Sequence, residues 1–254
     1  MQADASNPAT ALLIEDDPFA QFALRQYLEA KRFSVISATT YAEARQLIAS
    51  QTPPPLLGIV DLALRETDES VPAMRDAYGI ELVHILKRLY PQIAIVIWTA
   101  YFDGVARILP LLTCGYTGLA CVAKGSPESA LNEAITRALS HDVYLHHSIV
   151  MAHPEPADAM FLKALGPELA PVIEQIAARF ADLTPRQREV AERMTCTTNI
   201  IAQQLGLTVM TVRKYTDAIY ERLELKEDSS INGFRRDAMI VLAHTLRRMR
   251  IVEE

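Results

Sequence analysis

The sequence has few cysteines and no long apolar run. Its three cysteines among 254 residues have no CxxC spacing, which argues against a disulfide framework and a structural zinc site. We expect all three thiols to fill space in the core: Cys114, Cys121 and Cys196. Apolar runs such as Ile93–Trp98 are far shorter than the roughly 20 residues that cross a bilayer, so we expect no membrane span. Met1–Pro8 lacks the basic flank and apolar stretch of a secretory signal, which predicts a cytoplasmic protein.

What is present is typical of a globular chain. Half of the residues are hydrophobic and 22% are charged, and the length favours two domains at roughly 150 residues each. The formal net charge of −6 is unevenly distributed, because residues 181–254 carry twelve Lys and Arg against eleven Asp and Glu. A net charge of +1 in that part indicates nucleic-acid binding only weakly, so the evidence for or against such binding must come from local motifs.

The region from Ala11 to Ser140 alternates short apolar runs with amphipathic helical stripes. Five runs have the length and β-branched content of strands: Ala11–Glu15, Phe33–Ala38, Leu56–Asp61, Ile93–Trp98 and Gly118–Ala123. Because helical stripes separate them, the pattern predicts a five-stranded, doubly wound parallel sheet with helices on both faces. We therefore expect a first domain over residues 1–140.

Residues 141–181 differ in composition and predict a partly helical linker. They hold four of the six histidines, then Pro154 and Pro156, then a helical stretch around Phe161–Phe180 that Gly166-Pro167 breaks. No histidine pair has a helical spacing of four and no cysteine joins them, so we expect no metal there.

Residues 182–254 read as helical throughout. Thr184 and Gln187 fit a capping box with Pro185 at the first helical position, so a helix begins there. Gly206 separates a short helix from a longer one that follows Thr208, and two helices joined by a short turn with glycine are typical of a helix-turn-helix. A last helix is expected from about 229 to 250.

Acidic residues follow two of the predicted strands. The first strand leads into Glu15-Asp16-Asp17 and the third ends at Asp61. Ligands of open parallel sheets bind at the carboxyl edge, where these strands end. Carboxylates that converge there repel one another unless a cation joins them, and hard oxygen ligands suit Mg²⁺. Asp61 is then placed to act as a nucleophile toward a phosphoryl group.

In this arrangement the first part of the chain resembles the receiver domain of two-component response regulators, over about residues 9–140. The resemblance rests on Ile14-Glu15-Asp16-Asp17-Pro18, Asp61, Thr99-Ala100 and Lys124, which occur in the family's order at strand ends. It implies a flavodoxin-like fold in which Asp16, Asp17, Asp61 and the backbone carbonyl of Ala63 hold Mg²⁺. It further implies that Asp61 accepts phosphate from a histidine kinase, and that Thr99 and Lys124 sense the phosphoryl group.

Three features depart from the receiver pattern. Seventeen residues, Leu62–Tyr78, separate Asp61 from the expected start of the third helix at Gly79, which is more than the family usually has. Cys121 stands where the family usually has a switch aromatic, and Pro110 falls in the expected fourth helix. We expect the long segment to be a functional loop beside Asp61, since compact domains seldom carry unstructured loops beyond about 12–15 residues.

The C-terminal part resembles the LuxR/FixJ/NarL-type helix-turn-helix domain. The resemblance rests on Leu183–Val190, Ile201-Ala202, Leu205-Gly206-Leu207, Thr211–Lys214 and Arg222-Leu223. On a helical wheel, one face of the second helix is apolar, while Met210, Lys214, Asp217 and Glu221 lie opposite. The resemblance implies base contacts from Arg213, Lys214 and Asp217, and phosphate contacts from Thr211.

The sequence therefore predicts a cytoplasmic response regulator that binds double-stranded promoter DNA as a homodimer and is a switch, not a metabolic enzyme. A haloacid-dehalogenase-type phosphotransferase also uses an aspartyl nucleophile and Mg²⁺, but it requires a second acid where this chain has Ala63. The other alternative is a receiver that acts through protein partners only, with a degenerate DNA-binding module.

Overall fold

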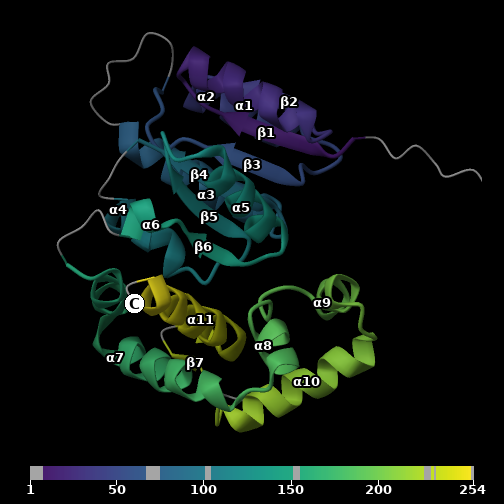
Figure 1. Ribbon diagram of the computed structural model, residues 1–254, viewed down its shortest axis with the longest axis vertical. Coiled ribbons are helices and arrows are strands. Elements are labelled where there is room, and N and C mark those ends of the chain that lie inside the picture. Colours follow the sequence, from purple (N-terminus) through teal and green to yellow (C-terminus); the bar gives the residue numbers. More distant parts are fainter. Residues whose placement is uncertain are drawn as a thin grey trace, which may run out of the picture. The chain divides into compact units, whose positions relative to one another are not determined.

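The computed structural model describes residues 8–66, 75–100, 104–150, 155–225, 230–231 and 233–252. The chain divides into two compact units, Met1–Thr99 and Ala100–Glu254. Figure 1 labels the helices and strands of both units. The predicted boundaries near 140 and 181 stay a prediction. Within the second unit, helix α4 (Gly104–Leu112) packs against the long helix α7 (Ala157–Arg179), and α6 (His147–Val150) packs against α11 (Arg236–Val252).

The strands form a parallel sheet in the order β2-β1-β3-β4-β5-β6. Their bounds are β1 Thr10–Ile14, β2 Ser34–Ala38, β3 Leu57–Val60, β4 Ala94–Thr99, β5 Leu119–Ala123 and β6 Val143–Leu145. The parallel α/β fold is thus confirmed, and the ends of each predicted strand lie within one residue of the observed ends. The predicted number of five strands was wrong, because Val143 pairs with Leu119 and adds β6 inside the segment that we had interpreted as linker.

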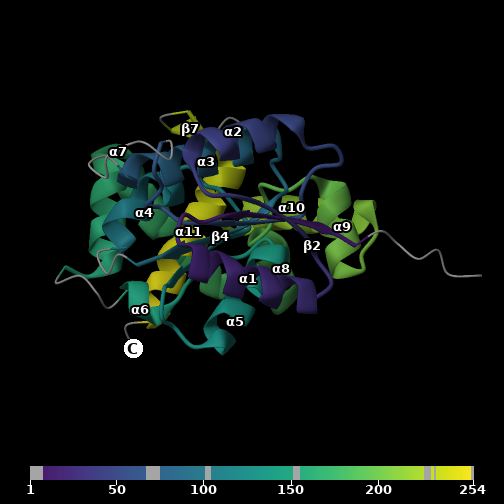
Figure 2. The same ribbon diagram turned by 90° about the horizontal axis from the view of Figure 1, so that it is seen from above.

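The first unit builds its core from both faces of its strands. Leu12, Leu13 and Ile14 of β1 and the four residues of β3 are buried. Figure 2 shows helices α2 (Tyr41–Ser50) and α3 (Arg75–Leu89) on one face and α1 (Pro18–Ala30) on the other. Strands covered on both sides must be apolar throughout, which explains why they read as continuous hydrophobic runs.

Helix α3 begins earlier than predicted, at Arg75 instead of Gly79. The segment Leu62–Tyr78 is therefore shorter as a loop than the sequence suggested, and its part 67–74 lies outside the described residues. The described beginning is ordered by burial, because Leu62 and Leu64 are both fully buried. Whether the segment acts as a functional loop stays a prediction.

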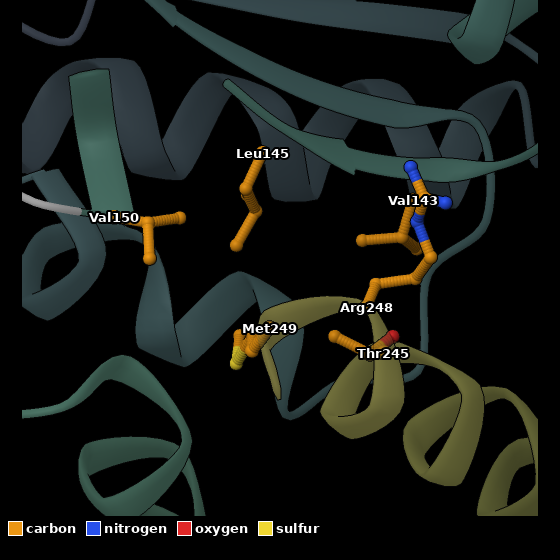
Figure 3. A pocket seen from close by; sticks show the side chains of 6 residues that line it. All are labelled: Val143, Leu145, Val150, Thr245, Arg248 and Met249. Atoms are coloured by element: carbon orange, nitrogen blue, oxygen red, sulfur yellow. The ribbon is translucent and has the colours of Figure 1, made fainter. Parts of the chain in front are cut away.

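The second unit begins with α4, β5, α5 (Glu128–Leu139), β6 and α6. Pro110 lies inside α4, which continues to Leu112 and has nine residues. Figure 3 shows side chains of β6, α6 and α11 facing one another around a cavity of about 10 Å³, lined by Val143, Leu145, Val150, Thr245, Arg248 and Met249. A space of this size holds about one water molecule, so it is a small gap in the packing and too small for a larger ligand.

Helices make up most of the remaining chain. Helix α7 is interrupted at Gly166, whose φ of 79° and ψ of 172° confirm the predicted break. A 3-10 helix, η2 (Phe180–Asp182), leads to α8 (Pro185–Ala191), α9 (Thr198–Leu205) and α10 (Val209–Arg222). The last helix was predicted from about 229, but the short strands β7 (Ser230–Ile231) and β8 (Phe234–Arg235) pair antiparallel and delay its start to Arg236.

Two details complete the description of the fold. Cys121 and Cys196 are buried as expected, whereas Cys114 is exposed, so the prediction that all three thiols fill the core was wrong for Cys114. Among the helices in the described part of the chain, none combines the length and the apolar character that crossing a membrane requires.

Candidate functional site

An acidic cluster lies where the strand order of the first unit reverses. The chain passes from β1 to β2 on one side and then to β3 on the other, so the carboxyl ends of β1 and β3 flank the switch point. Glu15 and Asp16 follow β1, and Asp61 follows β3. One carboxylate oxygen from each of these three residues lies within 4.8 Å of the others. We call Glu15, Asp16 and Asp61 the acidic cluster.

Backbone N–H groups hold two of the three carboxylates in place. The N–H of Asp17 donates to Glu15 Oε1 at 3.1 Å, and the N–H of Ala63 donates to Asp61 Oδ1 at 3.1 Å. Glu15 is 1% exposed and Asp61 is 2% exposed. Anionic groups this close and this buried repel one another, which makes the cluster a candidate site for a cation.

Asp17 has a structural role at the start of α1. Its Oδ1 accepts from the N–H groups of Phe19 at 2.8 Å and Ala20 at 3.1 Å, which makes Asp17 the N-cap of α1. A carboxylate at the N-cap satisfies orphan amides and interacts favourably with the helix dipole. Within the described residues, the acidic cluster contains Glu15, which we had not assigned to the metal, and the metal role of Asp17 stays a prediction. The signal for the N-cap was Asp17-Pro18, since proline is favoured just after an N-cap.

Gly79 lets α3 approach the end of β3 closely. A Cβ atom at this position would lie 2.4 Å from Leu62 Cα and 2.5 Å from the Asp61 carbonyl oxygen. Only a residue without a side chain fits, although the backbone of Gly79 is helical. The contact fixes the backbone of Asp61 against a helix, and sequence reasoning had used Gly79 only as the expected start of that helix.

The other predicted receiver residues are found at strand ends. Thr99 ends β4 and is fully buried. Lys124 directly follows β5 in the second unit and is half-buried. Cys121 lies inside β5, where burial raises the pKa of its thiol. The phosphoryl-sensing roles of Thr99 and Lys124 stay predictions.

The second unit contains a helix-turn-helix formed by α9 and α10. The predicted capping box is confirmed at the start of α8, where the Thr184 N–H donates to Gln187 Oε1 at 2.9 Å and the Gln187 N–H donates to Thr184 Oγ1 at 3.3 Å. Gly206 ends α9 in the left-handed conformation, with φ 62° and ψ 37°. The N–H of Thr211 then donates to Thr208 Oγ1, which caps α10. The turn therefore has the geometry that the sequence predicted.

Helix α10 buries one face and exposes the opposite one. Val212, Ile219 and Leu223 are buried against the neighbouring helices, as the helical wheel predicted. Arg213, Lys214 and Asp217 are exposed, and their side chains form no hydrogen bond or ion pair with the residues that the structure describes. Met210 is 61% exposed on the first turn. Thr211, which we predicted as a phosphate contact, is half-buried, and its hydroxyl lies 2.8 Å from Thr208 Oγ1.

Other arginines of this module hold the helices together. Arg186 donates to the Leu205 carbonyl oxygen at the end of α9 and also pairs with Glu189. Arg222 donates to the Asp182 carbonyl oxygen at 2.7 Å, and Arg188 to the Leu183 carbonyl oxygen at 3.0 Å. Because these cations are committed to backbone carbonyls, Arg213 and Lys214 of α10 are the better candidates for nucleic-acid contacts.

A second group of titratable residues lies in the second unit. Ligand atoms of Asp142, Glu192 and His244 lie within 4.8 Å of one another. Each carboxylate already has an arginine partner, Arg137 for Asp142 at 3.1 Å and Arg193 for Glu192 at 3.4 Å. Burial raises the pKa of Glu192 and lowers the pKa of His244 to about 4. The group is thus charge-balanced by the protein itself.

Comparisons with known proteins give structural likenesses only. No family model matches the sequence, and no curated protein matches it. A structure of the Salmonella typhimurium response regulator RcsB is 17% identical over 94% of this chain and 98% of its own, with a TM-score of 0.47. Full-length FixJ from B. japonicum is 20% identical over 94% and 97%, with a TM-score of 0.40. A receiver-domain protein from Clostridium thermocellum is 19% identical over 52% and 94%, with a TM-score of 0.41. Likeness at this level does not assign a function.

Proposed function

We propose that this chain is a phosphorylation-controlled, DNA-binding response regulator. The observation that carries the proposal is the acidic cluster at the switch point of the parallel sheet, with Asp61 held beside Glu15 and Asp16. A helix-turn-helix on the same chain, which exposes Arg213, Lys214 and Asp217 on α10, is the proposed DNA-binding part. The protein is a switch and not a metabolic enzyme.

Asp61 is the phosphoacceptor in this proposal. A carboxylate oxygen attacks the phosphorus of a phosphohistidine on a partner kinase, the P–N bond breaks, and the imidazole leaves with the electron pair and takes up a proton. The N–H of Ala63, which donates to Asp61 Oδ1, orients the carboxylate so that its other oxygen can attack. The product is an acyl phosphate on Asp61.

The donor set of the acidic cluster fits Mg²⁺. Three carboxylate oxygens within 4.8 Å are hard ligands of the kind that this ion prefers, and two of the side chains are buried. Glu15, Asp16 and Asp61 would hold the ion, and the carbonyl of Ala63 is the further ligand implied by the resemblance. When bound, Mg²⁺ supplies neutralisation of the phosphoryl oxygens.

Thr99 is assigned the role of reading the phosphorylated state. It ends β4, the strand that pairs with β3, and the register places Ile97 opposite Val60. Its hydroxyl therefore belongs to the strand next to Asp61 and can donate to a phosphoryl oxygen. Movement of a fully buried threonine disturbs the surrounding core, which gives phosphorylation a route to a structural change.

The output of the proposed switch is promoter binding by α10. Arg213 and Lys214 can donate to guanine in a major groove, and Asp217 can accept from a cytosine amino group. Two copies of the helix are needed to read half-sites about one helical turn apart, so we propose a homodimer on DNA. Such a switch works in the cytoplasm, where kinase and DNA are both within reach.

Footprinting on genomic fragments tests this function. The purified chain is applied with and without beryllofluoride, a phosphoryl analogue, and the Arg213→Ala, Lys214→Ala double variant serves as the control. We expect discrete protected sites whose occupancy changes with beryllofluoride and which the double variant loses. Protection that is absent in both states, with intact beryllofluoride binding, would favour a receiver that acts through protein partners only.

A further inference from the structure

The segment after Asp61 is fastened to the start of α2. Arg65 forms a parallel bridge with Thr40, the N-cap of α2. The N–H of Tyr41 donates to the Arg65 carbonyl oxygen at 2.9 Å, and the N–H of Ala42 donates to the Glu66 carbonyl oxygen at 3.1 Å. These are among the first N–H groups of the helix, which have no partner inside it. The backbone of Arg65 is therefore fixed relative to the start of α2.

This anchoring brings a cation to the acidic cluster. Arg65 Nε lies 3.4 Å from Asp16 Oδ2, and the exposed fractions of the two side chains are 42% for Arg65 and 13% for Asp16. The same Asp16 side chain contributes an oxygen to the cluster with Glu15 and Asp61. The guanidinium thus neutralises part of the charge that would otherwise attract a divalent ion.

We propose that Arg65 is a built-in competitor of Mg²⁺ for Asp16, and that it sets the Mg²⁺ affinity of the phosphoacceptor site. The inference rests on the proposed function, because it assumes that the acidic cluster holds Mg²⁺. The ion and Arg65 are drawn to the same Asp16 carboxylate, and the ion meets the repulsion of a positive charge nearby. Half-exposed ion pairs are weak, so the competition lowers Mg²⁺ affinity by about two- to fivefold and does not abolish binding.

Mg²⁺ titration of the full-length protein tests the proposal without any phosphorylation step. Trp98 is the only tryptophan and follows Ile97, the register partner of Val60, so its fluorescence reports on the strand beside Asp61. Calorimetry provides an independent Kd. The test variant Arg65→Gln removes the charge but keeps the backbone carbonyl that accepts from Tyr41, and Arg65→Lys restores a cation.

The matched control is Arg45→Gln. Arg45 is an exposed arginine of the same unit that pairs at 3.7 Å with Glu81, which is not part of the cluster. We expect Arg65→Gln to bind Mg²⁺ two- to fivefold more tightly than the natural protein, Arg65→Lys to lie closer to the natural protein, and Arg45→Gln to be unchanged.

Two other results would overturn the proposal, and they differ in what they imply for the proposed function. Equal Mg²⁺ affinity of the natural protein and Arg65→Gln, or tighter binding by Arg45→Gln to the same degree, overturns the role of Arg65 and leaves the proposed function standing. Absence of Mg²⁺ binding in every variant, with unchanged thermal unfolding, overturns both the competitor role and the magnesium site of the proposed function.

Discussion

Substituting Gly79 by alanine should damage the phosphoacceptor site from outside it. The added Cβ would lie 2.4 Å from Leu62 Cα, about 1 Å closer than ordinary contact, and the obstacle is backbone instead of a flexible side chain. Overpacking of this kind costs about 1–3 kcal/mol, whereas alanine gains up to about 1 kcal/mol in helix propensity. Because the obstacle is backbone, we expect the upper part of the range, a net loss of about 2 kcal/mol.

The matched control is Gly58→Ala in β3. There a Cβ atom would meet Ile93 Cδ1 at 3.6 Å and Leu86 Cδ1 at 3.7 Å, which is ordinary van der Waals contact. We expect this variant to be as stable as the natural protein or slightly more so, since glycine is unfavourable inside a strand.

Urea unfolding followed by Trp98 fluorescence measures both variants. The phosphorylation rate is the second readout, because a displacement of about 1 Å at a reacting group costs as much as 100-fold in rate. We expect Gly79→Ala to be slowed at least tenfold. Unchanged stability and rate in Gly79→Ala, or equal losses in Gly58→Ala, would refute the reasoning.

Three further predictions concern the acidic cluster, the DNA interface and the buried histidine. Glu15→Gln should weaken Mg²⁺ binding strongly, whereas Asp17→Asn should leave it near normal because asparagine also caps helices. Equal effects of the two variants in an Mg²⁺ titration would contradict the proposal that Glu15, and not Asp17, holds the ion. Lys214→Ala should lower the discrimination between operator and random DNA by about 1–3 kcal/mol in competition binding, while equal weakening on both would mean a phosphate contact only. Burial lowers the pKa of His244 from 6.5 to about 4, so the unfolded chain takes up the proton first and stability falls as the pH drops from about 6.5 to 4. His244→Gln should reduce this fall in the free energy of unfolding by up to about 3 kcal/mol. Urea unfolding of both proteins at a series of pH values measures the difference. The raised pKa of Glu192 changes stability in the opposite direction, and it does so in both proteins.

Elements with a strong periodic pattern were predictable from the sequence. The buried strands β1, β3 and β4 read as apolar runs because helices cover both of their faces, and the ends came within one residue. The capping box at Thr184 and the left-handed Gly206 are local signals, so they needed no knowledge of the tertiary fold. Strand β6 was missed because three residues give no readable period, and only its pairing with β5 identifies it.

The candidate site was predictable in composition but not in detail. Three consecutive acids follow β1, and spacing alone does not say which of them cap a helix and which face the switch point. Arg65 and Gly79 escaped prediction because their roles depend on contacts between elements, with Asp16 in one case and with the backbone after β3 in the other. Such contacts leave no local pattern in the sequence.

Labelling of Asp61 tests the central claim most directly. The natural protein and Asp61→Asn are incubated with Mg²⁺ and a small phosphodonor such as phosphoramidate, and the phosphoryl content of each intact chain is measured by mass spectrometry. Asparagine has the same shape as aspartate and removes one negative charge from the cluster, so the variant should fold. The account predicts one phosphoryl group on the natural protein and none on the variant. Equal labelling of both proteins would contradict it.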